Sequence, residues 1–184
     1  IDRLDVTDHS QIDQLAEKYS TTAIDVLLNN AGISGDTKNQ IFGTMNYDVY
    51  HKVLAVNTIG PLKMAEAFYP HVKASEQKKI ITVSSSEGSI ATADKRGGGR
   101  LFFYRSSKSA LNMVMVNLAL QLKNRGVAVG MINPGATDTD FMTGLPFPLR
   151  KTEVAVSDMI RNIDSITVEN TGAYLNYNGK TVPW

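Results

Sequence analysis

The sequence predicts an α/β protein with a doubly wound parallel sheet. Short apolar runs alternate with longer segments whose apolar residues recur at helical spacing. The apolar runs end in polar or glycine-containing loops. Alternation of this kind gives right-handed βαβ units, in which helices cover both faces of a parallel sheet. The carboxyl ends of the strands then lie along one edge, where ligands bind in open sheets of this type.

Composition restricts the classes of protein to which the chain can belong. Its 184 residues, 42% of them hydrophobic, suit one globular domain over residues 1–184. The net charge of +1 comes from charges of mixed sign, so neither nucleic acid nor a membrane is an expected partner. The absence of cysteine excludes disulfides and thiolate metal sites, and no metal site is predicted. No long apolar run or export signal is present, so we expect a cytoplasmic protein.

The first part of the chain contains two predicted strands with a helix between them. Residues 1–6 alternate apolar and polar side chains, which predicts a short strand, and residues 10–19 show helical spacing. Residues 23–28 are too apolar to alternate, as expected of a buried parallel strand. This run leads into the loop Asn29-Asn30-Ala31-Gly32.

A long helical pattern from residue 46 to about residue 74 contains a proline. Pro61 lacks the N–H group that a helix interior uses, so we expect a kink or a free backbone group near it. Asn57 lies four residues earlier. Its side chain either holds a water molecule at the defect or only satisfies loose backbone, and the sequence leaves both interpretations open.

Two more apolar runs predict buried strands that end in polar loops. Residues 79–83 lead into Ser84-Ser85-Ser86-Glu87-Gly88, and residues 127–133 lead into Pro134-Gly135 and the polar segment 137–140. Because the strands are parallel, we expect these loops to meet the Asn29 loop at one edge of the sheet.

The remaining segments predict loops, a helix and a last strand. Residues 89–103 are polar and glycine-rich, which indicates a surface excursion. A phosphate-binding role for Gly97-Gly98-Gly99 is the alternative, but no clear strand precedes these glycines. Residues 141–149 predict a loop over the site, followed by a helix over 152–165 and a strand over 172–176.

The segment Tyr104-Arg105-Ser106-Ser107-Lys108 begins a helical pattern that extends to about residue 125, with Gly126 placed to cap it. A phenol and an ammonium four residues apart share one helix face. The cation can lower the phenol's pKa from its ordinary value of about 10, which would make Tyr104 a proton donor near neutral pH. Taken alone, the pattern is common by chance and fits the start of an amphipathic helix.

Jointly, these motifs resemble the short-chain dehydrogenase/reductase family. In that family's order, and near its spacing, the chain carries Asn29-Asn30-Ala31-Gly32, Asn57, Ser85, Tyr104 with Lys108, and Pro134-Gly135 with Thr139. Residues 104–113 and 177–184 are most similar to carbonyl reductases of the sniffer and C-factor type. The resemblance implies a Rossmann-like fold and an NAD(P)-dependent oxidoreductase that reduces a ketone or aldehyde. Its partner would be a small carbonyl or alcohol substrate.

The resemblance implies a catalytic role for four residues. Asn57 would hold a relay water, Ser85 would bond the substrate carbonyl, and Tyr104 would donate the proton. Lys108 would hold the nicotinamide ribose and lower the pKa of the tyrosine. Ser85 is preferred to its neighbours because it lies three residues before Gly88, as in the family's loop.

The resemblance also implies a set of cofactor contacts, with NADP(H) favoured over NAD(H). Asp5 and Val6 would lie beside the adenine. Asn29, Ala31 and Gly32 would form the ribose-side wall. The nicotinamide and phosphate end would be contacted by Tyr104 and Lys108 together with Pro134, Gly135, Thr137 and Thr139. Ala136 and Asp138 stand where close relatives carry tryptophan and lysine, so the rim of the substrate pocket is not predicted.

The chain contains no Gly-x-x-x-Gly-x-Gly run, and it begins at Ile1 rather than methionine. Members of the family open with a strand, a glycine-rich turn, a helix and a second strand that selects the cofactor. We therefore expect an N-terminally incomplete domain that lacks its first βαβα segment. Its cofactor would lose the helix N-terminus that binds pyrophosphate, so the chain as printed should be inactive. The alternative is a short, non-catalytic relative that acts through oligomerisation or partner binding.

In the family, the helical segments predicted over residues 46–74 and 104–125 commonly pack against their copies, so a homodimer is expected. Val114, Met115 and Leu118 are the candidate contacts, although the same side chains could simply cover the sheet.

Overall fold

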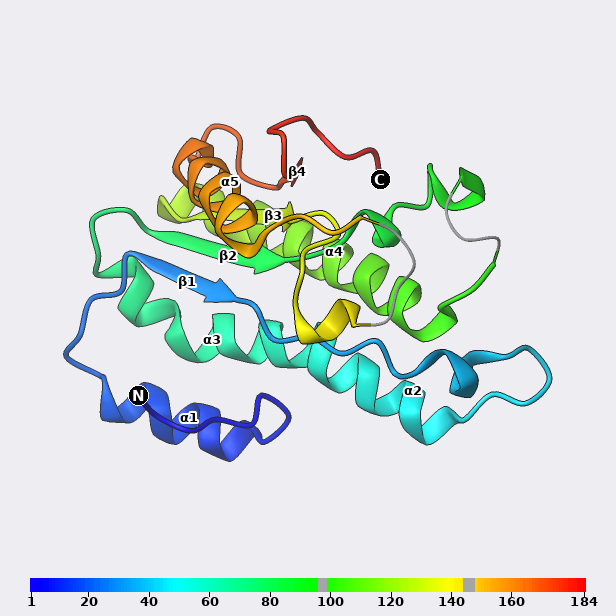
Figure 1. Cartoon of the computed structure of the whole chain (residues 1–184). Helices are drawn as coiled ribbons and strands as arrows, with labels where there is room; N and C mark the ends of the chain where they lie inside the picture. Colours follow the sequence, from blue (N-terminus) through cyan, green and yellow to red (C-terminus); the bar gives the residue numbers. More distant parts are fainter. Residues whose placement is uncertain (96–98, 144–147) are drawn as a thin grey trace.

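The computed structural model describes residues 1–95, 99–143 and 148–184. Its centre is a four-stranded, wholly parallel sheet in the order β1-β2-β3-β4 (Figure 1). The strands are β1 (Val26–Asn29), β2 (Lys79–Val83), β3 (Ala128–Asn133) and β4 (Ala173–Asn176). The predicted parallel sheet is confirmed, and the order follows the sequence because each crossover places the next strand beside the last.

Helices cover both faces of the sheet (Figure 1). One face carries α3 (Gly60–Lys73) and α4 (Phe102–Leu122), with α1 (His9–Lys18) packed outside α3. The other face carries α5 (Thr152–Ser165). Neighbouring residues of β2 serve opposite faces, since Ile80 packs in the cluster under α3 and α4 while Ile81 packs against the side of α5.

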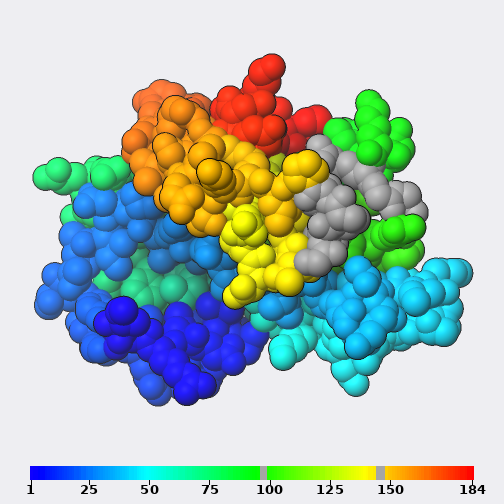
Figure 2. Space-filling view, in the orientation of Figure 1, coloured from blue at the N-terminus to red at the C-terminus, as the bar shows by residue number. Residues whose placement is uncertain are grey.

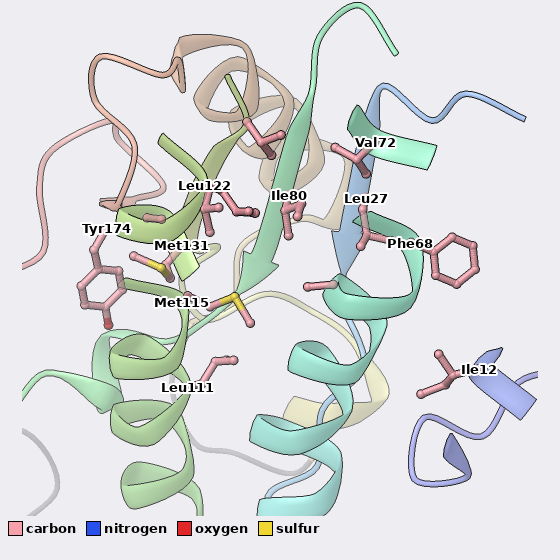
Figure 3. Packing of buried hydrophobic residues seen from close by; sticks show 14 of the residues in the cluster. Ile12, Leu27, Phe68, Val72, Ile80, Leu111, Met115, Leu122, Met131 and Tyr174 are labelled. Atoms are coloured by element: carbon pink, nitrogen blue, oxygen red, sulfur yellow. The ribbon is translucent and has the colours of Figure 1, made fainter. Parts of the chain in front are cut away.

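The larger core cluster lies under α3 and α4 (Figure 3). Met115 and Leu111 project from α4 toward Ile80 and Met131 of the central strands, and all four side chains are fully buried. Met115 therefore cannot contact a second subunit, so its assignment as a dimer contact is wrong. Val114 and Leu118 are partly buried and also pack against this cluster. A side chain on an apolar helix can point to either face, which the sequence pattern alone did not resolve.

The predicted strand over residues 1–6 is wrong. These residues form no strand; they run beside α1 and end in a turn at Val6-Thr7. An alternating pattern makes a strand only where a neighbouring strand can supply hydrogen bonds. Instead, the Asp5 amide donates to Gln11 Oε1, and Leu4 packs against the core cluster. Within the described ranges β1 pairs with β2 alone, so Leu28 stays 42% exposed at the free edge.

The long helix predicted between residues 46 and 74 is continuous but irregular. It comprises α2 (Tyr47–Leu54), a π-helical turn (Ala55–Ile59) and α3. Pro61 lies in the first turn of α3, immediately after the π-turn. The predicted backbone defect is the π-turn that contains Asn57, and Pro61 has no N–H to give the Asn57 carbonyl the α-helical hydrogen bond.

The other boundaries agree with the predictions to within a few residues. α4 begins two residues before Tyr104, and Gly126 adopts a left-handed conformation (φ 73°) after its last turn, as a helix cap does. Among the described residues, 3₁₀ turns lie in the loops over Thr37–Gln40, Ser86–Gly88, Ala93–Lys95 and Asp140–Met142, and another, Lys123–Arg125, directly follows α4. Gly97 and Gly98, the core of the alternative phosphate-binding loop, lie outside the described residues. Across the described parts of the chain, no helix has the length and apolarity to cross a membrane.

Candidate active site

The carboxyl ends of three strands and the first turns of α4 meet at one edge of the sheet. β1 ends at Asn29, β2 continues into Ser84-Ser85, and β3 continues into Pro134. Tyr104 and Lys108 lie on the first two turns of α4, which packs on the loop after β2. The edge predicted from the sequence is therefore the place where these side chains gather.

Ser85 is the serine of its triplet that meets Tyr104, through a side-chain hydrogen bond. Its hydroxyl also accepts from the Glu87 amide at 3.2 Å, which caps the 3₁₀ turn that follows. The preceding hydroxyl, of Ser84, points inward and donates to Asn112 Oδ1 at 2.6 Å. The Ser84 hydroxyl is therefore engaged by Asn112, and the catalytic role of Ser85 stays a prediction.

The loop after β2 lies tightly against α4. A Cβ atom on Gly88 would lie 2.9 Å from the backbone and Cβ of Lys108, so only glycine allows this approach. The Ser109 hydroxyl donates to the Gly88 carbonyl oxygen at 2.8 Å, which fixes the loop to the helix. The close packing holds Ser85 and Tyr104 in reach of one another.

Lys108 is 3% exposed, and its ammonium donates to the Val83 carbonyl oxygen at 2.8 Å. Its Nζ lies 5.8 Å from the centre of the Tyr104 ring. Burial lowers the pKa of Lys108 from 10.5 to about 8. A Cβ on Gly32 would lie 3.6 Å from this Nζ, so the loop after β1 reaches the lysine as well.

The expected lowering of the Tyr104 pKa by Lys108 is wrong for the structure as it stands. Burial raises the pKa of Tyr104 to about 12; the hydrogen bond with Ser85 lowers it in part, and Glu87 raises it. Lys108 is not among the groups that shift this pKa, and its ammonium donates to the Val83 carbonyl oxygen. The phenol therefore stays protonated throughout the neutral pH range.

Asn57 ties the loop after β1 to α4 from a fully buried position. Its Nδ2 donates to the Ile33 carbonyl oxygen at 2.8 Å and to Ser107 Oγ at 2.9 Å. Its Oδ1 accepts from the Ile33 amide at 2.9 Å. The side chain thus satisfies loose backbone, which was one of the two interpretations left open. The carbonyl that faces Pro61 is the group at which a water molecule could bond.

Four of the predicted cofactor contacts line one surface pocket although residues 1–6 form no strand. Asp5, Val6, Ala31 and Gly32 share it with Arg3, Leu4, Gln11, Ile33 and Val56. The Asp5 carboxylate accepts from the Thr7 amide at 2.9 Å and from its hydroxyl at 2.7 Å, and these bonds hold its pKa below the usual value. Asn29 lies nearby with its Nδ2 buried and without a hydrogen-bond partner among the described residues.

The loop after β3 holds the other predicted cofactor contacts, and Arg150 fixes its shape. The guanidinium donates to the Pro134 carbonyl oxygen at 2.6 Å, pairs with Asp158 and lies 4.1 Å from the Tyr177 ring centre. Gly135 is left-handed (φ 76°), and a Cβ there would lie 2.9 Å from the Tyr177 ring. No sequence signal indicates Arg150, since its contact with Pro134 spans 16 residues.

The threonines of this loop are bonded within it. Thr137 Oγ1 donates to the Gly135 carbonyl oxygen at 3.3 Å, and Thr139 Oγ1 donates to the Thr137 carbonyl oxygen at 3.4 Å. Both hydroxyls keep lone pairs for a ligand, and their contact with a cofactor stays a prediction.

Phe141 lies beside Tyr104, with ring centres 5.6 Å apart and a tilt of 50°. Its side chain is 45% exposed. The segment around residue 140 (yellow in Figure 2) lies at the surface between α5 and the loop that follows β1. The predicted loop over the site therefore contributes an aromatic side chain next to the tyrosine. Residues 144–147, the middle of that loop, lie outside the described residues.

The parallel sheet, with Ser85, Tyr104 and Lys108 at its carboxyl edge, defines a Rossmann-like domain. The chain belongs to the short chain dehydrogenase family, whose model matches residues 2–146.

Known proteins similar to the chain include carbonyl reductases and a protein named C-signal. It is 32% identical over 169 residues to the C-signal of Myxococcus xanthus, a match that covers 92% of this chain and 98% of that protein. The NADPH-bound carbonyl reductase from chicken fatty liver has a TM-score of 0.87 at 28% identity, over 98% of this chain and 75% of that one. The carbonyl reductase Sniffer of D. melanogaster has a TM-score of 0.86 at 26% identity, over 100% of this chain and 77% of that one.

Proposed function

We propose that the protein is an NADP(H)-dependent carbonyl reductase in which Tyr104 donates the proton to the substrate oxygen. The observation that carries the proposal is the hydrogen-bonded pair of Ser85 and Tyr104 at the carboxyl edge of the sheet, with the Lys108 ammonium buried beside it. A ketone or aldehyde oxygen bound between the two hydroxyls receives hydrogen bonds where negative charge develops.

Reduction forms a C–H bond at the carbonyl carbon, breaks the π bond and adds a proton to the oxygen. The reduced nicotinamide, when bound, supplies the hydride. Tyr104 suits the proton transfer because its phenol, with a pKa of about 12, is protonated at neutral pH. Its proton passes to the oxygen only as that oxygen becomes strongly basic. Ser85 holds the same oxygen and keeps its position as the charge changes.

Lys108 and Asn57 support Tyr104 in this proposal without bonding the substrate oxygen. The Lys108 ammonium would bind ribose hydroxyls, for which its position beside Gly32 is suitable. A water on the Asn57 carbonyl, left without its helical donor by Pro61, would return protons toward the site.

The residues present fit the nicotinamide end of a dinucleotide. Asn29 Nδ2 is a buried donor without a partner among the described residues, and Gly32 leaves space next to Lys108 Nζ. At the adenine end, Asp5 and Val6 share a pocket with Ala31. The NADPH of the chicken carbonyl reductase supports NADP(H) as the cofactor. The pyrophosphate has no glycine-rich turn in residues 1–184, so we propose that this chain by itself does not catalyse the reaction.

A second candidate is a non-catalytic role through oligomerisation or partner binding. It is favoured by the C-signal of M. xanthus, since this chain covers 98% of that protein and its name denotes a signal rather than a reaction.

The complete protein here means residues 1–184 together with any chain that adjoins them. Its titration with NADPH, followed by an assay with a reactive dicarbonyl, separates the two functions. The reductase proposal predicts saturable NADPH binding and loss of NADPH absorbance that depends on the dicarbonyl. Failure of the complete protein to bind NADPH would contradict that proposal and favour the second candidate.

A further inference from the structure

The carbonyl group of Ser85 is held by a residue from the far edge of the sheet. Tyr174, on β4, is 1% exposed, and its hydroxyl donates to the Ser85 carbonyl oxygen. The two residues lie 89 positions apart in the chain, and β3 lies between β4 and β2, the strand that leads into Ser85. In Figure 3 the Tyr174 ring lies in the core close to Met131, with its hydroxyl at the end remote from the backbone.

Among the described residues, Tyr174 is one of two donors to this carbonyl. The Gly88 amide donates to the same oxygen at 2.8 Å, as the 3₁₀ turn requires. Without the Tyr174 hydroxyl the carbonyl would still have a partner, and the turn would still form but be held by the Gly88 bond alone. The second bond fixes the orientation of the Ser85 peptide, and hence the direction of the hydroxyl that meets Tyr104.

The end of the chain holds Tyr174 in turn. Residues after β4 fold back on it, because the Val182 amide donates to the Tyr174 carbonyl oxygen at 2.8 Å. Trp184 then stacks on the Tyr174 ring, with centres 5.2 Å apart and planes 27° apart. The Trp184 carbonyl oxygen accepts from the Ala91 amide at 2.7 Å, so the same residue also binds the loop after β2 directly.

We propose that Tyr174, supported by Trp184, is a positioning residue that orients Ser85 toward Tyr104. The inference has a structural half, that Tyr174 orients Ser85, and a catalytic half, that this orientation raises kcat. Only the catalytic half rests on the proposed carbonyl reduction. Since the proposed role of Tyr174 involves no contact with the substrate oxygen or the cofactor, its loss should lower kcat and leave the KM for NADPH unchanged.

The test compares Tyr174→Phe with Tyr69→Phe in the complete protein. Each change removes one buried phenol hydroxyl, but the Tyr69 hydroxyl, on α3, has no hydrogen-bond partner among the described residues. We expect Tyr174→Phe to reduce kcat about fivefold to tenfold, the effect of one hydrogen bond, while Tyr69→Phe retains the wild-type value. Trp184→Ala changes a side chain that is 50% exposed, so it should fold normally and lower kcat by a smaller factor.

Amide hydrogen exchange over residues 84–91 gives a readout that does not depend on activity. We expect faster exchange in Tyr174→Phe and Trp184→Ala, and no change in Tyr69→Phe. Wild-type exchange in both of the first two variants would overturn the structural half. Faster exchange with an unchanged kcat would overturn the catalytic half. A wild-type protein that reduces no carbonyl would overturn the proposed function instead, and the exchange data would still decide whether Tyr174 orients Ser85.

Discussion

The Lys108 ammonium lies 5.8 Å from the centre of the Tyr104 ring, yet it donates its hydrogen bond to the Val83 carbonyl oxygen. The lysine therefore faces the end of β2 rather than the phenol. Its charge is available to a ligand at the edge of the sheet, although its burial is unfavourable for folding.

Replacement of Lys108 by methionine should raise the stability of the fold while it impairs the site. Burial lowers the lysine pKa from 10.5 to about 8, a difference of about 3 kcal/mol that disfavours folding below pH 8. Loss of the bond to Val83 offsets about 1 kcal/mol of the gain. Lys108→Met should therefore unfold in urea with a free energy about 1–2 kcal/mol higher at pH 7, and it should bind NADPH more weakly.

The same lysine predicts a pH dependence of stability. Between pH 8 and 10.5 the unfolded chain binds more protons at Lys108 than the folded chain, so the wild-type protein gains stability from this residue as pH rises. The stability difference between Lys108→Met and the wild type should shrink across that range in urea unfolding at a series of pH values. A difference that stays constant would refute the burial argument.

Asn57 should contribute more to stability than Asn29, although both are buried asparagines. Asn57 makes three hydrogen bonds with Ile33 and Ser107, and its removal leaves the amide and the carbonyl of Ile33 without these partners. We expect Asn57→Ala to cost about 2–4 kcal/mol. Asn29→Ala should cost less than about 1.5 kcal/mol, because its Nδ2 has no partner in the described part of the chain. Equal losses in urea unfolding would contradict the role assigned to Asn57.

Phe141 should influence which carbonyl compounds are reduced. Its ring lies 5.6 Å from that of Tyr104 and is 45% exposed, so it can contact the apolar part of a bound substrate. Phe141→Ala should raise the KM for aromatic ketones about tenfold and leave that for a small aldehyde nearly unchanged. Phe42→Ala provides the control, since that ring is 85% exposed. Equal effects on both substrates would argue against a substrate contact.

The sequence predicted the sheet and the site edge because both depend on local patterns. Apolar runs such as residues 79–83 have one way to be buried, and parallel strands bring their ends together. The strand predicted over residues 1–6 was wrong because an alternating pattern carries no information about whether a partner strand is present. The predicted lowering of the Tyr104 pKa was wrong because desolvation, which depends on tertiary packing, raises that pKa, and Lys108 is not among the groups that shift it. The contact between Tyr174 and Ser85 joins residues 89 positions apart and has no local signature.

The most direct test of the proposed mechanism is the turnover of Tyr104→Phe in the complete protein, with Tyr69→Phe as the control. The change removes the proton donor and keeps the ring that packs against Phe141. We predict that kcat for dicarbonyl reduction falls by about a factor of 10³, while the NADPH dissociation constant stays within about twofold. A Tyr104→Phe enzyme that reduces the dicarbonyl at near wild-type rate would contradict the assignment of Tyr104 as the proton donor.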